Sequence, residues 1–236
     1  MKKILSIFFI VPVCVLSMLT LLTTIYIFSR EEPLFFIRNI KINGAHQLKD
    51  NDIMSSISPF LRENLFKIDV EKMKKIIASH PFVKEVKIKR VYPFSIVIDV
   101  EEKKPSALWV GSDGRISVLD ETGEPYKGLT KSDAQNMFII NAGDKADVKS
   151  LFREVNRWVA DGIMKRDGIS EVAYDEGSVT VFGAEDGVEI ILGKEDQEGR
   201  LKRAIVVLED AKKRGLMIKC IDARFEKGAI IQERKG

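Results

Sequence analysis

The sequence has few of the side chains on which most enzymes and metal sites depend. Its 236 residues include two histidines, His46 and His80, and two cysteines, Cys14 and Cys220. His46 follows a turn glycine and His80 precedes a proline at a predicted helix end, so structural or solvated roles fit both histidines better than catalysis. We therefore predict no catalytic residue, no metal site and no cofactor, because phosphate-loop, Ser-x-x-Lys and metal-ligand spacings are also absent. A hydrolase remains an open alternative, because the fold could bring together two carboxylates that are far apart in the sequence.

Residues 4–28 contain no charged side chain, whereas Lys2 and Lys3 lie just before them. As a helix this stretch is roughly 37 Å long, enough to cross a hydrocarbon core of about 30 Å. Lipid offers the backbone no hydrogen-bond partner, so such a segment must be helical. Lysines mark the cytoplasmic end of a span. We therefore predict a cytoplasmic tail at 1–3 and a transmembrane helix at 4–28.

A cleaved signal peptide is the alternative interpretation of this N-terminus. Its apolar core would be too long, however, and no small-x-small cleavage site follows Tyr26. We favour an uncleaved anchor, which places the rest of the chain outside the cytoplasm. Cys14 then lies in the membrane and cannot pair with Cys220, which is predicted to be a small buried residue of a strand, so no internal disulfide is expected.

The net charge is small, +3 at pH 7, and gives no reason to expect a nucleic-acid partner or a strongly acidic one. Nothing in the sequence points to a small-molecule substrate. Lysines and one arginine gather between Lys72 and Arg90. We interpret them as a solvated face, with attraction to anionic lipid headgroups as the alternative.

Residues 34–103 have the pattern of a small α+β domain with the order strand, helix, helix, strand, strand. Alternating residues predict strands at 36–42, 86–89 and 96–100. Asp50 and Asp69 are predicted to cap the two helices, which end near Pro59 and His80. The charged segment Glu101–Pro105 is the predicted domain boundary.

Residues 105–232 predict a second α+β domain, a mixed and mainly antiparallel sheet with two longer helices. The first helix is predicted to begin at a cap on Asp147, and the second carries an apolar stripe from Leu201 to Ala211. Asp120–Gly123 is a predicted turn. Strands are predicted at 107–110, 116–119, 137–140, 169–174, 179–182, 188–192, 217–225 and 229–232.

Several segments, in order, resemble the bacterial FtsQ/DivIB family of cell-division proteins. Residues 66–70, 80–93 and 100–107 are similar to the POTRA domain that follows the anchor in that family. Residues 187–193, Arg200-Leu201 and 221–229 resemble the end of its β domain. The resemblance spans nearly the whole chain behind the predicted anchor.

The resemblance implies a non-enzymatic hub of the division septum in the bacterial inner (plasma) membrane. It implies binding to FtsB-like and FtsL-like single-pass proteins and to other divisome membrane proteins, and a part in controlling septal peptidoglycan synthesis. The family contact is strand addition along the last strand, here 229–232, with Phe225 on the strand before it. The implied partner-binding residues are Phe225, Lys227, Gly228, Ala229, Ile230 and Ile231.

Two other interpretations remain beside this one. In the first, Phe225 and Ile230 are core residues and the last sheet edge is merely tolerated. In the second, the chain is a POTRA-containing factor for envelope protein assembly or translocation. Such factors carry POTRA domains in tandem before a membrane barrel, whereas one unit and no barrel are predicted here, so we rank this function behind the septal one.

Overall fold

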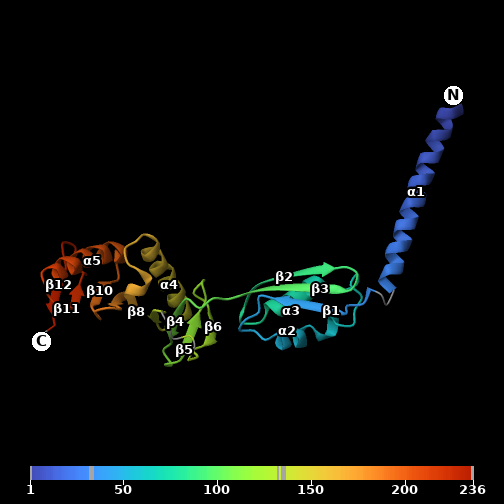
Figure 1. Cartoon of the computed structure of the whole chain (residues 1–236). Coiled ribbons are helices and arrows are strands. Elements are labelled where there is room, and N and C mark those ends of the chain that lie inside the picture. Colours follow the sequence, from blue (N-terminus) through green and yellow to red (C-terminus); the bar gives the residue numbers. More distant parts are fainter. Residues whose placement is uncertain (1, 32–34, 132, 134–136, 235–236) are drawn as a thin grey trace. The chain divides into compact units, whose positions relative to one another are not determined.

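The computed structural model describes residues 2–31, 35–131, 133 and 137–234. The chain divides into two compact units, with the division between Glu102 and Lys103 (Figure 1). We call residues 35–102 the first folded unit and residues 103–234 the second folded unit. Each has its own hydrophobic core.

The chain begins with one long helix, α1 (Lys2–Glu31), which is longer at both ends than the predicted span. Its segment Val11–Phe28 is long and apolar enough to cross a membrane. The hydroxyls of Thr20, Thr23 and Thr24 donate hydrogen bonds of 2.8 Å to carbonyls one turn earlier. These polar groups are therefore satisfied within the helix, as a lipid environment requires.

The first folded unit is a three-stranded sheet with two helices, in the predicted order of elements. It comprises β1 (Asn39–Asn43), α2 (Asp50–Ser56), the 3-10 helix η2 (Ser58–Phe60), α3 (Val70–Ala78), β2 (Val83–Val91) and β3 (Ser95–Glu102). The central strand β3 pairs parallel with β1 and antiparallel with β2. Ile96, Ile98 and Val100 of β3 are buried together with Met73 and Ile77 of α3, so the helices cover one face of the sheet.

The two helices of this unit differ in whether a side chain caps their first turn. Asp69 caps α3 as predicted, because its carboxylate accepts a 2.9 Å hydrogen bond from the amide of Lys72. The predicted cap at Asp50 is wrong: Asp50 is already helical, Lys49 occupies the cap position, and no side chain caps α2. Asp50 instead lies in the first turn of α2, where its negative charge interacts favourably with the positive end of the helix dipole.

The loop after β1 is fixed to the end of β3 by two contacts. Gly44 has φ +80° and approaches the sheet so closely that a Cβ there would lie 2.1 Å from the carbonyl oxygen of Val100. One carboxylate oxygen of Glu102 accepts hydrogen bonds from the amides of His46, Gln47 and Leu48 at 2.8–2.9 Å. Burial alone would raise the pKa of Glu102, but these amide bonds outweigh it and lower the pKa.

The second folded unit is a nine-stranded sheet with two long helices. Its elements are β4 (Ala107–Val110), β5 (Ile116–Leu119), β6 (Pro125–Gly128), β7 (Ile139–Asn141), α4 (Lys145–Ala160), the 3-10 helix η3 (Arg166–Gly168), β8 (Ile169–Asp175), β9 (Ser178–Gly183), β10 (Glu189–Gly193), α5 (Gln197–Lys213), β11 (Ile218–Asp222) and β12 (Ile230–Glu233). The strand order is β12-β11-β10-β9-β8-β7-β4-β5-β6. Five neighbouring pairs are antiparallel, and β4–β7, β7–β8 and β10–β11 are parallel. The sheet is therefore mixed and mainly antiparallel, as predicted.

Both long helices belong to the same hydrophobic core. Phe152 and Trp158 of α4 and Leu201 of α5 are buried in one cluster with side chains from β7 to β11. Facing residues of paired strands point to the same side of a sheet. The helices thus cover one face of the sheet and leave the residues that alternate with the buried ones on the other face.

Two predictions for this unit were wrong, and one strand was not predicted. Asp144, rather than Asp147, caps α4, and its carboxylate accepts from the amides of Ala146 and Asp147 at 2.8 and 2.9 Å. Strand β6 was not predicted, because Tyr126 is the only large apolar residue in it. Strand β11 ends at Asp222, three residues before the predicted end, so Phe225 does not belong to it. Cys220 lies in β11 as expected but is only half-buried.

Candidate functional site

Strand β12 lies at one edge of the nine-stranded sheet. It pairs antiparallel with β11, in a register that joins Asp222 to Ile230, Ile221 to Ile231 and Cys220 to Gln232. On its other side no strand follows within the described part of the chain. An edge strand presents backbone N–H and C=O groups that can accept a further strand.

On the helix-covered face of the sheet, the side chain that β12 contributes is partly exposed. One row of paired residues runs across five strands and is at most 1% exposed: Ile140, Val172, Val181, Ile190 and Ile221. The next residue of this row is Ile231, which is 37% exposed. Ile231 has a sheet neighbour on one side only, so an added strand would complete the burial of its side chain.

The opposite face of the sheet also ends in an isoleucine. Thr180, Ile191, Asp222 and Ile230 form a row across β9 to β12, and Ile230 is 59% exposed. Ile230 and Ile231 therefore place one aliphatic side chain on each face of the same edge. The interpretation in which Ile230 is a core residue is wrong for this structure.

A seven-residue turn, 223–229, connects β11 to β12 and carries the other predicted residues. The amide of Ala223 donates to the carbonyl of Ile191 at 2.9 Å. The guanidinium of Arg224 turns back to the carboxylate of Asp222, with an Nη2–Oδ2 distance of 2.6 Å. These contacts end β11 at Asp222 and bring the chain out of the sheet.

The predicted residues of this turn differ in exposure. Phe225 is 48% exposed, so it is neither a core residue nor a strand residue. Lys227 is exposed, Gly228 is half-buried with φ +131°, and Ala229 is half-buried against the core. The structure thus places Ile230 and Ile231 in the edge strand and Phe225, Lys227, Gly228 and Ala229 in the turn that precedes it.

The ionisable groups beside the edge are held in ordinary charge states. The hydrogen bonds from Arg224 lower the pKa of Asp222, so this carboxylate stays ionised. Burial, together with the nearby charges of Glu189 and Asp222, raises the pKa of the Cys220 thiol. A thiol with a raised pKa is less ionised at neutral pH and is therefore a weaker nucleophile.

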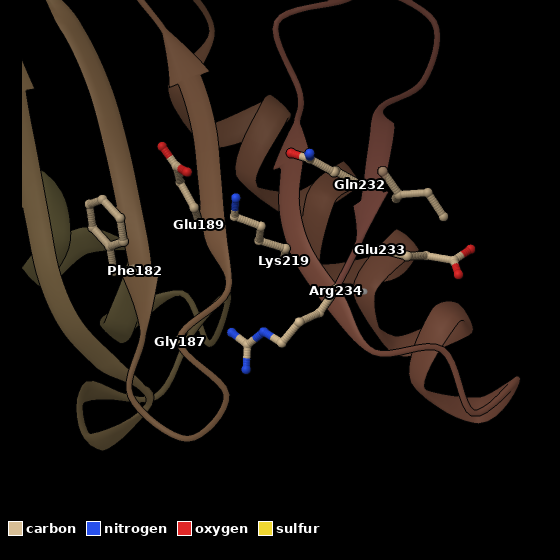
Figure 2. Close-up of a pocket in the computed structure, with 8 residues that line it drawn as sticks. Phe182, Gly187, Glu189, Lys219, Gln232, Glu233 and Arg234 are labelled. Carbon is tan, nitrogen blue, oxygen red and sulfur yellow. The ribbon is translucent and has the colours of Figure 1, made fainter. Parts of the chain in front are cut away.

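A shallow hollow runs beside the edge strand (Figure 2). Figure 2 shows lining side chains from four neighbouring strands, with Phe182 on β9, Glu189 on β10, Lys219 on β11 and Gln232 on β12. Gly187, Ile231, Glu233 and Arg234 complete the lining. The amide of Arg234 donates to the carbonyl of Met217 at 2.7 Å, and its guanidinium donates to the carbonyl of Asp186 at 3.2 Å. Arg234 therefore holds the end of β12 against the sheet.

The groups exposed at this edge are suited to binding an extended segment. It offers an open backbone edge, two exposed isoleucines and charges of both signs in the hollow. Among the described residues no group of three or more His, Cys, Asp or Glu side chains is arranged to hold a metal ion. Backbone hydrogen bonds with alternating side-chain contacts are how proteins bind an extended peptide segment.

Sequence reasoning found part of this site and missed the rest. Ile230 and Ile231 lie in the strand predicted at 229–232, whereas their role in partner binding was implied by the family resemblance and stays a prediction. The predicted strand ended at residue 232, whereas Glu233 extends β12 and Arg234 fixes its end. The apolar residues of a strand are visible in a sequence, whereas a backbone bond to Met217 depends on the register and is not.

The fold defines a protein with an apolar N-terminal helix, a POTRA-like unit and a larger mixed-sheet unit that ends in an open strand. Residues 35–103 match the family model of the POTRA domain, FtsQ-type, and residues 107–224 match that of the cell division protein FtsQ/DivIB, C-terminal. The second match is half of the chain, and it ends before β12. The chain belongs to the FtsQ/DivIB family of cell-division proteins.

Individual relatives agree with this assignment. The cell division protein FtsQ of Hahella chejuensis is 27% identical over 197 residues, which are 81% of this chain and 67% of that protein. Cell division protein FtsQ of Geotalea daltonii is 25% identical over 211 residues, 84% of this chain and 76% of the relative. That of Myxococcus fulvus is 25% identical over 200 residues, 80% and 69% of the two chains.

Proposed function

We propose that this protein is a non-enzymatic scaffold of the division septum that binds a strand of an FtsB-type partner along β12. Helix α1 anchors it as a single-pass protein of the inner membrane, with residues 1–3 in the cytoplasm and both folded units outside. Through the FtsB-type protein it is linked to an FtsL-type protein, and the assembly helps to control septal peptidoglycan synthesis. Family membership and the open edge of β12 support this proposal.

The observation that carries the binding mode is the buried row that ends at Ile231. A partner strand beside β12 would bond to the outward backbone groups and place one side chain over Ile231 and another over Ile230. Burying the exposed part of an isoleucine contributes on the order of 1 kcal/mol. Backbone bonds would add to affinity, and the two aliphatic contacts would set the register.

The turn and the hollow extend the proposed contact. Phe225 is 48% exposed in the turn that leads into β12, and we expect it to contact the end of an added strand. Lys227 and Lys219 offer positive charge, and Glu189 and Glu233 offer negative charge. We expect a partner segment with alternating apolar residues and at least one acidic and one basic residue.

Ile230→Asp is the direct test of this contact. We expect it to weaken binding of the FtsB-type partner by about tenfold or more, because it puts a charge into the proposed apolar contact. Val206→Asp is the matched control: Val206 lies on α5 and is 66% exposed, so the same substitution meets water there. Affinity is measured by calorimetric titration of the full chain in detergent or nanodiscs.

A second variant addresses the backbone. Ile231→Pro removes a strand N–H and should abolish binding while both units remain folded, as judged by circular dichroism. Undiminished partner capture by both variants would refute strand addition at β12. In cells, depletion of the protein should give filaments with segregated nucleoids and no septa, and tagged protein should form midcell bands. Normal division or uniform envelope staining would refute the septal role.

A further inference from the structure

A cluster of exposed and half-buried apolar side chains, most of them aromatic, lies where the chain enters the first folded unit. The rings of Phe35 and Phe66 meet edge to face with centroids 5.1 Å apart, and those of Phe66 and Tyr92 lie 5.2 Å apart. Phe36, Val91 and Tyr92 are 39%, 46% and 57% exposed. We call Phe35, Phe36, Phe66, Val91 and Tyr92 the entry patch.

The backbone beneath the entry patch is firmly bonded. The amide of Leu65 donates to the carbonyl of Phe35 at 2.8 Å, and the amide of Ile37 donates to the carbonyl of Glu63 at 3.2 Å. The amide of Arg38 donates to the carbonyl of Phe94 at 2.9 Å, in the β2–β3 hairpin that carries Tyr92. The patch is therefore a fixed surface of three bonded segments, and its exposure is a property of the folded unit.

Two arginines have fixed contacts beside this apolar surface. The guanidinium of Arg38 lies over the ring of Phe94, 5.6 Å from its centroid, and that of Arg90 donates to the carbonyl of Ile68 at 2.8 Å. The charged residues of the three segments and their sequence neighbours have both signs: Arg30, Arg38, Arg62, Lys67 and Arg90 against Glu31, Glu32, Glu63 and Asp69. An apolar aromatic surface with arginines beside it is complementary to anionic lipid headgroups.

The covalent chain limits how far this surface can lie from a membrane. The apolar segment of α1 ends at Phe28, and only residues 32–34 separate the last helical residue, Glu31, from Phe35. Three helical rises and four Cα–Cα steps span at most about 20 Å. Helix α1 thus tethers the entry patch to the membrane surface. A short tether gives the patch a high effective concentration at that surface, so even weak contacts with lipid can form.

We propose that the entry patch binds the anionic headgroup surface of the membrane that α1 crosses. Tyr92 and the phenylalanines would enter the headgroup layer, where aromatic rings are favoured, and the arginines and Lys67 would face lipid phosphates. The inference rests on α1 spanning the membrane. It is independent of β12, so neither result decides the other.

The test measures the depth of a spin label in the full chain, reconstituted in nanodiscs. Val91→Cys carries the nitroxide in a Cys14→Ser, Cys220→Ala background. His46→Cys is the matched site: it lies by Glu102 at the opposite end of the same sheet, about 25 Å away along the eight residues of β3. Accessibility to oxygen, which concentrates in lipid, is compared with accessibility to a water-soluble nickel chelate.

We expect the label at position 91 to be about fivefold less accessible to the nickel chelate than the label at position 46, in nanodiscs that contain phosphatidylglycerol. High salt, or phosphatidylcholine alone, should reduce the difference. Tyr92→Ser should also reduce it while the first folded unit stays folded, as judged by circular dichroism, because the Tyr92 residue is 57% exposed. Equal accessibility at the two sites in anionic nanodiscs would overturn the proposal, and equal protection in both lipids would overturn the assignment to anionic headgroups. Protection that needs an added protein would identify a protein as the occupant instead.

Discussion

Ile221 and Ile231 face each other across the β11–β12 pair, on the helix-covered side of the large sheet, yet only Ile221 is fully buried. Ile221 has a strand on each side and helices above it. Ile231 has one neighbouring strand and is 37% exposed. The same residue type in the same row thus serves the core in one strand and remains available for contact in the next.

Alanine substitutions at these two positions should separate folding from binding. Ile221→Ala should lower the free energy of unfolding of the second folded unit by about 2–5 kcal/mol, because it opens a cavity. Ile231→Ala should lower it by less than about 1.5 kcal/mol and should weaken partner binding more than Ile221→Ala does. Both tryptophans, Trp109 and Trp158, lie in this unit, so urea unfolding followed by fluorescence reports on it alone. Equal losses of stability would contradict the assignment of Ile231 to a binding edge.

Gly44 should tolerate no side chain. Gly44→Ala combines a positive φ with a Cβ placed 2.1 Å from the carbonyl oxygen of Val100, so we expect a loss of about 3 kcal/mol or more in the first folded unit. Gly114→Ala is the control, since Gly114 has φ +73° but no atom within 4 Å of the added Cβ, and about 1 kcal/mol is expected there. Calorimetry should show that Gly44→Ala lowers the melting temperature of the first folded unit. Tryptophan fluorescence should not report this transition, because both tryptophans lie in the second folded unit. A shift in the fluorescence transition would mean that the two units do not unfold independently.

Asp120 should make the stability of the second folded unit depend on pH. Its carboxylate is 5% exposed, accepts from the amide and hydroxyl of Thr122 at 2.8 and 2.6 Å, and lies 3.0 Å from Nζ of Lys103. Burial alone would raise its pKa, but the bonds to Thr122 and Lys103 outweigh burial and hold the pKa below the usual 3.8. A lowered folded-state pKa contributes stability above the unfolded pKa, and this is lost as pH falls through the folded value.

Asp120→Asn should therefore lower the free energy of unfolding by about 1–2 kcal/mol at neutral pH. The difference from the parent should shrink as pH falls from about 5 to about 3, because the parent loses its own contribution there. Urea unfolding at a series of pH values checks this. A difference that grows on acidification would show that the sign of the pKa shift is wrong.

The start of α4 offers a prediction on helix capping. Asp144→Ala removes the two bonds to the amides of Ala146 and Asp147 and should cost about 1 kcal/mol. Asp147→Ala removes only a first-turn charge and should cost about 0.5 kcal/mol or less. Tryptophan fluorescence is suited to the measurement because Trp158 is in α4. The reverse ranking would restore Asp147 as the cap.

Local sequence patterns predicted most elements, because each depends on side chains a few residues apart. Alternation in β3 and the stripe of Leu201, Ala204 and Ala211 in α5 are examples, and both sets are buried. Strand β6 was missed because Pro125, Lys127 and Gly128 give no alternation. The parallel pairs, such as β10 with β11, were not predicted, because pairing across an intervening helix depends on tertiary packing.

The candidate site was predicted only in outline for a similar physical reason. An apolar run at the end of the chain indicated a strand at Ile230 and Ile231. The exit of the chain from the sheet at Asp222 depends on the bond from Ala223 to Ile191 and on the ion pair of Arg224 with Asp222. Neither contact has a sequence pattern of its own, so Phe225 was placed on a strand that ends before it.

The hydrogen bond from the amide of Arg234 to the carbonyl of Met217 fixes the end of β12, a strand with one neighbouring strand. The position of β12 at the rim affects how easily it separates from the sheet. Opening of a strand at the rim requires fewer contacts to break than opening of an inner strand, so β12 should exchange its amides with solvent before β11 does. A partner that binds only when β12 is paired with β11 would stabilise the paired state by mass action. The stabilisation grows with the logarithm of the partner's concentration divided by its dissociation constant. The order of the last strand would then report how much partner is present.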